Sequence, residues 1–228
     1  MAAENMFLYW GSGSIPCWKA MLALEEKGFG GYKNKLCSFQ KKEHKSEEIL
    51  ALNPRGQLPT FKDGNIVVNE SNAIIEYLES AYPNNGAKLL PDDKAERAKV
   101  YQVFHELANL HDIFVEKLIH YKMFTPKDKI DENLLKEKYE ACRKEMTVWD
   151  EKLKKGGANA FIAGTSFTMA DCTLYPYLAI AKRLGLKMEK WSALDAYYNR
   201  LTDRPSVKTT WPPHWKETPG DTAVLGDI

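Results

Sequence analysis

Residues 5–18 read NMFLYWGSGSIPCW, and this stretch decides the fold. Its first six residues form a short apolar run that stops at Gly11 and Gly13, which is typical of a buried strand. Pro16 suits the first turn of a helix, where its missing N–H costs nothing. A helix is therefore expected over residues 15–27, and Gly28 is its stop signal. The chain opens as a strand, a tight turn and a helix.

The alternation of strand and helix continues beyond this stretch. A second strand is expected over residues 32–39. The dipeptide Asp63-Gly64 separates the runs 58–62 and 66–69, which predicts an antiparallel hairpin. Helical spacing returns over residues 71–82. The order β-α-β, loop, β-β-α predicts one small α/β sheet layer covered by helices.

A linker and a second domain follow. Residues 85–93 are rich in Pro, Asn, Gly and Asp, as a linker would be. After them the apolar residues keep helical spacing, and Thr168 and Asp171 are expected to cap an internal helix. We therefore predict an α/β domain over residues 1–84 and an all-helical domain over residues 94–228.

Composition excludes several classes of protein. The 228 residues carry 32 Lys and Arg against 31 Asp and Glu, and this net charge of +1 argues against nucleic-acid binding through bulk charge. No apolar run approaches the roughly 18 residues of a membrane span, and because residues 1–13 lead directly into a strand-like stretch, we expect no signal peptide. The four cysteines lie far apart, which argues against a zinc site and a dithiol redox centre. We expect a cytoplasmic protein without a bound metal that associates with neither nucleic acid nor membrane.

The turn before the first helix is the strongest candidate site. A helix N-terminus offers unpaired N–H groups and the positive end of the helix dipole, which stabilise an anion or a thiol that becomes one. Ser12 and Ser14 each add a hydroxyl donor. Capping the helix is the commonest role of a serine in the position of Ser14, so both interpretations stay open on the residues alone.

Three further segments carry groups that could bind a ligand. A cis Leu58-Pro59 bond would turn the Leu58 backbone outward, although roughly 5–6% of such bonds are cis and trans is the expectation from base rates. Glu70-Ser71 opens a helix, where it either binds a charged ligand or caps the helix. His44-Lys45 lies in a basic loop, which on charge alone is a solvated surface.

Together these segments resemble a cytosolic glutathione S-transferase. The matching motifs are Ser14 to Cys17, Asn53 to Phe61 and Glu70-Ser71, with residues 167–171 and 203–207 in the helical half. The resemblance covers about residues 5–210. Within the family the chain is similar to the serine-dependent theta and delta classes, and especially to the rho class of aquatic animals. The resemblance implies a thioredoxin-like N-terminal domain, an all-helical C-terminal domain and a homodimer.

The resemblance also implies a glutathione site and an activity. The Ser14 hydroxyl would donate to the glutathione thiolate, as a hydrogen-bond donor and not as a nucleophile. The other implied glutathione-binding residues are His44 and Lys45 for the glycine carboxylate with Gln57 nearby, Leu58 beside a cis Pro59 for the cysteinyl unit, and Glu70 and Ser71 for the γ-glutamyl end. The thiolate would be conjugated to hydrophobic electrophiles in detoxification of xenobiotics, with organic hydroperoxide reduction as a side activity. Glutathione is a co-substrate, and no cofactor or metal is implied.

Alternatives remain for several roles. Tyr9 is a second possible thiol partner, because it lies near the end of the first strand as in the tyrosine-dependent classes, and Ser12 is a third. The candidates for the electrophile site are Tyr9, Ser12, Phe114, Leu118, Met123, Phe124, Trp211 and Trp215. For the four residues in the helical half, ordinary core packing is the alternative. Two other functions also stay open: a non-catalytic glutathione-binding or structural member of the fold, and a glutaredoxin-like thiol-transferase acting through Cys17.

Overall fold

The computed structural model describes residues 3–228, which form two compact units. The first unit runs to Leu90 and also takes in Arg204–Thr218, while the second comprises Pro91–Asp203 and Pro219–Ile228. The sequence analysis predicts instead one continuous domain over residues 94–228, and the first two residues of its N-terminal domain lie outside the described residues. The difference arises because a helix near the C-terminus packs against the first helix of the chain.

A four-stranded mixed sheet forms the centre of the first unit. Its strands are β1 (Met6–Trp10), β2 (Lys33–Leu36), β3 (Thr60–Asp63) and β4 (Ile66–Asn69), in the order β2-β1-β3-β4. β1 and β2 are parallel, whereas β1–β3 and β3–β4 are antiparallel. The predicted hairpin is confirmed, but its two loop residues are Gly64 and Asn65, one position later than predicted. Gly64 has a φ of 57°, a conformation that glycine adopts without strain.

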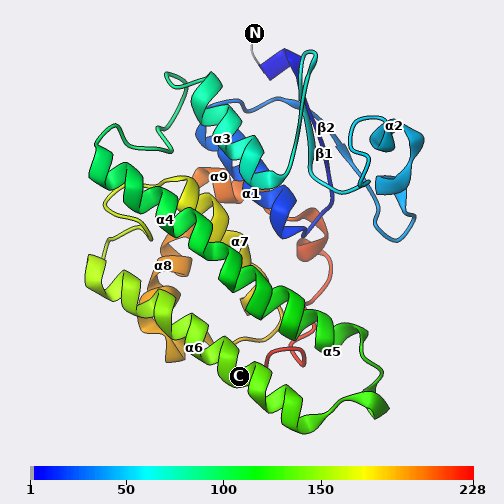
Figure 1. Cartoon of the computed structure of the whole chain (residues 1–228), viewed down its shortest axis with the longest axis vertical. Helices are drawn as coiled ribbons and strands as arrows, with labels where there is room; N and C mark the ends of the chain where they lie inside the picture. The colour runs from blue at the N-terminus through cyan, green and yellow to red at the C-terminus, as the bar shows by residue number, and fades with distance from the viewer. Residues whose placement is uncertain (1–2) are drawn as a thin grey trace. The chain divides into compact units, whose positions relative to one another are not determined.

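Helices cover both sides of this sheet. Figure 1 shows α1 (Ile15–Glu26) and α3 (Ser71–Ala81) on one side and the short α2 (Glu47–Leu50) on the other. α1 packs against two helices, α3 and α9 (Pro205–Thr210). Because α1 has neighbours on several faces, it is apolar almost all round and largely buried. The remaining short elements of this unit are the 3-10 turns η1 (Ala3–Asn5), η2 (Glu43–Lys45) and η6 (Pro213–Lys216).

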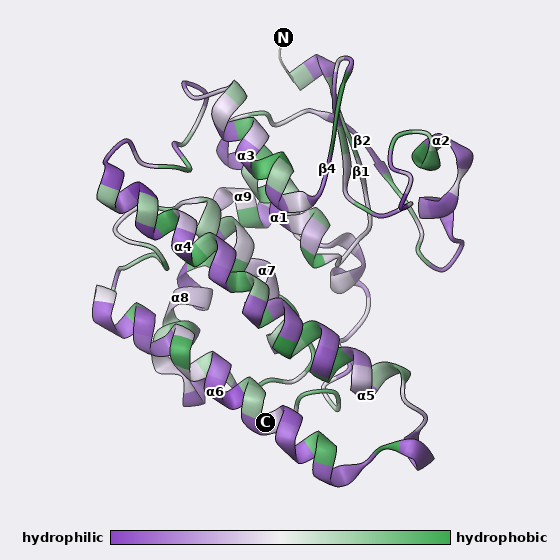
Figure 2. Cartoon of the chain, in the orientation of Figure 1, coloured by the Kyte–Doolittle hydropathy of each residue, from purple (hydrophilic) through white to green (hydrophobic). Residues whose placement is uncertain are grey.

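The second unit is helical, as predicted. Its elements are α4 (Lys94–Leu110), the π-helical segment η3 (His111–Ile119), α5 (His120–Phe124), η4 (Lys127–Lys129), α6 (Glu132–Gly156), α7 (Met169–Arg183), η5 (Met188–Lys190) and α8 (Ser192–Thr202). Figure 2 shows α4 and α6 banded by hydrophilic and hydrophobic residues, the pattern of helices with one buried face. Among the described residues, no helix is long and apolar enough to cross a membrane.

α7 is the most buried helix of the second unit, and a buried carboxylate fixes its first turn. Asp171 accepts hydrogen bonds from the backbone N–H groups of Thr168 (2.8 Å) and Ile162 (3.0 Å). It also accepts from the hydroxyl of Tyr197 at 2.8 Å. The predicted capping pair of Thr168 and Asp171 is confirmed, and the same carboxylate additionally joins α7 to α8.

Candidate active site

The strand register brings the four predicted segments to one edge of the sheet. Tyr9 pairs with Thr60, and Thr60 pairs with Asn69. Trp10 pairs with Leu36 on the other side of β1. Four segments therefore meet at one end of the sheet: the turn after β1, the loop after β2, the stretch before β3 and the turn after β4.

Ser14 is the N-cap of α1. Its Oγ accepts a long hydrogen bond of 3.5 Å from the backbone N–H of Cys17. This bond uses an oxygen lone pair, and a second, side-chain hydrogen bond from Ser14 lowers the pKa of the Cys17 thiol against the larger effect of burial. Because a hydroxyl rotates, its hydrogen can be donated to another acceptor in place of this thiol. Ser14 is half-buried at the start of the helix, where the dipole favours negative charge. The capping role and a donor role are therefore compatible.

Tyr9 is held by a different set of partners. Its hydroxyl donates to Glu48 at 2.7 Å, and the same carboxylate accepts from Lys35 at 2.6 Å. Burial, and then the bond to Glu48, raise the pKa of Tyr9 to about 12. The side chain is 6% exposed. The Tyr9 hydroxyl is thus already bonded between β1 and α2.

Ser12 is paired with a residue far along the chain. Its Oγ lies 2.6 Å from Nδ1 of His214 in η6. The neighbouring Gly13 is covered by the same segment: a Cβ at this position would lie 2.8 Å from Cε1 of His214 and 3.1 Å from Nε1 of Trp215. His214 and Trp215, near the C-terminal end of the first unit, therefore pack against one side of the turn that carries Ser14.

Contacts among three tryptophans hold this C-terminal segment against α1. Trp18 is 2% exposed and makes edge-to-face contacts with Trp211 and Trp215, with ring centroids 5.5 and 5.4 Å apart. Its Nε1 donates to the Thr210 hydroxyl at 2.8 Å. The sequence analysis includes Trp211 and Trp215 among its candidates but predicts none of the contacts that Trp18, Thr210 and His214 make. The signal in the sequence for these contacts is the pair of tryptophans in a Pro-rich tail, because two such side chains need an apolar surface to pack on.

Cys17 lies in a setting that keeps it a thiol. It is fully buried, and its Sγ accepts from the Gly11 backbone N–H at 3.3 Å. Burial raises the pKa of Cys17 to about 11. Redox-active cysteines are accessible and have lowered pKa values, so this environment is the opposite of the one that a thiol-transferase requires.

The basic loop packs closely on the segment before β3. The Lys45 ammonium donates to the Arg55 carbonyl at 2.7 Å. Gly56 has a φ of 54°, and a Cβ there would meet the Lys45 side chain at 2.8 Å and the His44 carbonyl at 3.0 Å. Nδ1 of His44 is buried and finds no hydrogen-bond partner among the described residues. This imidazole nitrogen is thus a free polar group in the candidate site.

The segment before β3 is braced by a buried amide. Asn53 donates to the Gln57 carbonyl at 3.0 Å, and Thr60 donates its hydroxyl to that carbonyl at 3.1 Å. Within the segment the Leu58-Pro59 bond is cis. The trans bond expected from base rates is wrong, whereas the cis bond implied by the family resemblance is present.

Glu70 adopts an unusual backbone conformation at the end of β4. Its φ is 71°, although it is not a glycine, and Ser71 begins α3 directly after it. Such conformations cost on the order of 1–3 kcal/mol and cluster at functional sites. The Glu70 side chain is exposed at the edge where the other candidate segments gather.

The candidates from the helical half fall into two groups. Phe114 and Leu118 lie in the π-helical η3 and are buried. Met123 and Phe124 lie in α5 and are 54% and 73% exposed. The buried pair fits the core-packing alternative, while the exposed pair offers an apolar surface.

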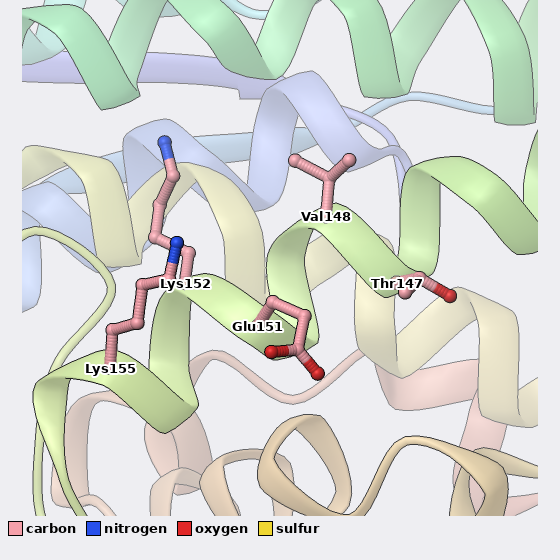
Figure 3. Close-up of a pocket in the computed structure, with 5 residues that line it drawn as sticks. All are labelled: Thr147, Val148, Glu151, Lys152 and Lys155. Carbon is pink, nitrogen blue, oxygen red and sulfur yellow. The ribbon is translucent and has the colours of Figure 1, made fainter.

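A separate groove runs along α6. Its volume is about 400 Å³, and Figure 3 shows the residues that line it: Thr147, Val148, Glu151, Lys152 and Lys155. It includes none of the residues predicted to bind glutathione or an electrophile. Within residues 3–228 no group of three or more His, Cys, Asp or Glu side chains is placed to hold a metal ion.

Comparisons with known proteins show to which family the chain is similar. Residues 8–86 match the family model of the glutathione S-transferase N-terminal domain, and residues 109–205 match that of the C-terminal domain. The chain is 44% identical to glutathione S-transferase A of Pleuronectes platessa over 226 residues, which cover 99% of this chain and 100% of the relative.

Solved structures give the same result. A glutathione S-transferase from the Antarctic clam Laternula elliptica is 47% identical with a TM-score of 0.90, and the match covers 97% of this chain and 99% of the clam chain. A delta-class glutathione transferase of Nilaparvata lugens is 26% identical with a TM-score of 0.75, covering 92% of both chains. The N-terminal domain is thioredoxin-like and the C-terminal domain is all-helical, as predicted. With both of its domains and almost its whole length matched, this chain belongs to the glutathione S-transferase family.

Proposed function

We propose that this enzyme conjugates the thiolate of reduced glutathione to hydrophobic electrophiles, and that the Ser14 hydroxyl stabilises this thiolate. One observation carries the choice of residue: the Ser14 hydroxyl lies at the N-terminus of α1 with the Cys17 backbone N–H and thiol as its partners, while the hydroxyl of Tyr9 donates to the Glu48 carboxylate, a stronger acceptor than a thiol. Membership of the family supports the class of reaction.

The magnitudes favour the hydroxyl as the main stabilising group. A free thiol has a pKa near 8.5 and is mostly protonated at pH 7, although only the thiolate is a good nucleophile. A hydrogen bond to a charged acceptor contributes roughly 1.5–3 kcal/mol, which lowers the thiol pKa by about one to two units. The dipole of α1 adds about 0.3–1 kcal/mol. Ser14 acts as a donor in this scheme and forms no covalent intermediate.

The rest of the glutathione molecule would lie along the shared edge of the sheet. His44 and Lys45 bind the glycine carboxylate beside Gln57, and the unpartnered Nδ1 of His44 supports this role. The Leu58 backbone beside Pro59 pairs with the cysteinyl unit. Glu70 and Ser71 bind the γ-glutamyl end, and the positive φ of Glu70 supports a functional role for this turn.

The electrophile would meet the thiolate at apolar surface. Trp211 and Trp215 support this assignment, because they pack beside the turn that carries Ser14. Met123 and Phe124 are exposed apolar residues of the second unit and are the candidates there. Organic hydroperoxide reduction is a side activity that the same activated thiolate would perform.

Three further properties belong to this proposal. We place the chain among the serine-dependent enzymes that resemble the theta and delta classes, and specifically in the rho class. A cytoplasmic location is supported by the four cysteines, which are all free thiols and all buried. A homodimer is supported by the edge strand β4, because its apolar Ile66 and Val67 are exposed.

The experiment that tests the proposal is an ultraviolet titration of the glutathione thiolate bound to the wild type and to Ser14→Ala. We expect a lowered thiol pKa in the wild type and a rise of about one to two units in Ser14→Ala, because one hydrogen bond to a charged sulfur is lost. Tight binding without a lowered pKa in the wild type would indicate the non-catalytic alternative. A lowered pKa that survives Ser14→Ala would transfer the role to Ser12 or Tyr9.

Two substitutions separate the remaining alternatives. Tyr9→Phe is expected to leave the pKa of the bound thiol unchanged, because the tyrosine hydroxyl is bonded to Glu48. Cys17→Ala is expected to leave conjugation largely intact, because the Cys17 thiol is buried and its pKa is raised. The measurements are the same titration for Tyr9→Phe and steady-state conjugation rates for Cys17→Ala. Abolition of activity in Cys17→Ala would revive the thiol-transferase hypothesis.

A further inference from the structure

The pairing of Ser12 with His214 lies directly beside the proposed thiol partner. Ser12 and Ser14 flank Gly13 within one turn, and the His214 imidazole contacts two of these three residues. A ring nitrogen that bonds a hydroxyl holds the position of the hydroxyl oxygen, whichever of the two atoms donates. His214 therefore holds the turn by a hydrogen bond at Ser12 and packs over Gly13, and Ser14 is the next residue.

The segment that supplies His214 is itself firmly held in the first unit. At its N-terminal end, Arg204 donates to both carboxylate oxygens of Glu26, at 2.5 and 2.7 Å, and the Ser206 hydroxyl bonds the same carboxylate. Further along, Trp18 packs against Trp211 and Trp215. Both Glu26 and Trp18 belong to α1, the helix that Ser14 caps. His214 is thus carried by a segment anchored to the helix whose N-terminus it adjoins.

We propose that His214 is a positioning residue for glutathione activation: acting through Ser12, it holds the Gly11–Ser14 turn in the geometry that presents the Ser14 hydroxyl to the thiolate. This inference rests on the proposed function of Ser14. His214 contacts Ser12 and Gly13, so in this proposal its effect reaches the thiolate through the backbone of the turn. Small displacements of a positioned group reduce catalysis strongly, which gives the contact a measurable consequence.

A double-mutant cycle tests the proposal. The variants are His214→Ala, Ser12→Ala and their combination, each measured for kcat/KM with glutathione and for the pKa of the bound thiol. We expect each single variant to lower kcat/KM about three- to tenfold, the equivalent of one neutral hydrogen bond. We expect the double variant to lose no more than either single variant, because both remove the same contact. All three should raise the pKa of the bound thiol.

Two further variants serve as controls. His214→Asn places an amide near the position of Nδ1 and is expected to restore most of the lost activity. His105→Ala removes another exposed histidine, whose ring stacks on Tyr101 in α4 of the second unit, and is expected to change neither quantity. Thermal unfolding shows which variants are folded. If His214→Ala does not fold, Ser12→Ala alone tests whether breaking the bond raises the thiol pKa.

The outcomes distinguish this inference from the function on which it rests. Independent, additive losses from Ser12→Ala and His214→Ala would overturn the positioning role, as would an unchanged thiol pKa in both variants. A wild-type thiol pKa that is not lowered, or one that Ser14→Ala leaves unaffected, would instead overturn the proposed function itself. Loss of thiolate in Ser14→Ala together with silent His214→Ala and Ser12→Ala variants would overturn only the inference.

Discussion

Replacing Glu70 by alanine is expected to raise the KM for glutathione about ten- to a hundredfold and to leave kcat nearly unchanged. A hydrogen bond between a carboxylate and the ligand's ammonium group contributes roughly 1.5–3 kcal/mol, which corresponds to this range. The γ-glutamyl end does not react, so the contact stabilises the bound substrate and the transition state equally, and its loss affects KM. Steady-state kinetics with varied glutathione at saturating electrophile measure both constants.

Matched variants make this result specific. Glu70→Gln keeps the shape and one acceptor but removes the charge, so its KM should lie between those of the wild type and Glu70→Ala. Glu76→Gln neutralises another carboxylate of the same region, in the interior of α3, and should leave KM unchanged. An unaltered KM in Glu70→Ala would remove Glu70 from the glutathione site. A loss in kcat alone would assign it a different role.

Replacing Asp171 by alanine is expected to lower the free energy of unfolding by more than about 3 kcal/mol, because stranding a buried donor costs about 1–3 kcal/mol and several are stranded together. The donors are the backbone N–H groups of Ile162 and Thr168 and the hydroxyls of Thr168 and Tyr197. This loss is a large share of the roughly 5–15 kcal/mol that stabilises a typical protein. Urea unfolding followed by circular dichroism measures it.

A surface carboxylate provides the comparison for Asp171. Asp112 is exposed and pairs with Lys117 at 2.5 Å, and an exposed ion pair contributes about 0–1 kcal/mol. Asp112→Ala should therefore shift the urea midpoint only slightly. Asp171→Asn retains one acceptor oxygen and should fall between the two alanine variants. Similar midpoints for Asp112→Ala and Asp171→Ala would show that the buried network adds little to stability.

Local patterns predicted the parts of the fold that depend on neighbouring residues. The hairpin follows from a turn dipeptide between two apolar runs, and the cap of α7 follows from Thr168 and Asp171, three residues apart. The hairpin loop was misplaced by one position because Gly64, and not Asp63, needs the positive φ. The π-helical form of η3 was not predicted, because Phe114 and Leu118 keep a spacing that an α-helix also explains.

Other features depend on contacts between distant residues and leave no local pattern. Ser12 and His214 are separated by 202 positions, and Trp18 and Thr210 by 192. The hydrogen bond from Tyr9 to Glu48 likewise joins β1 to α2, 39 residues away. The cis Leu58-Pro59 bond runs against the base rate and was implied only by the family resemblance. The sequence therefore indicates which segments meet at the candidate site but not which hydroxyls within it are already bonded.

The division of the chain has a consequence for recombining this enzyme with its relatives. A chimera joined at the boundary near Leu90 would take α1 from one parent and Arg204–Thr218 from the other, although these segments share one compact unit. Trp18 would then contact the other parent's residues at positions 211 and 215 instead of Trp211 and Trp215. Glu26 would likewise contact the other parent's residue at position 204 instead of Arg204. The module that can be exchanged intact is discontinuous in sequence: residues 204–218 must be inherited together with the N-terminal half.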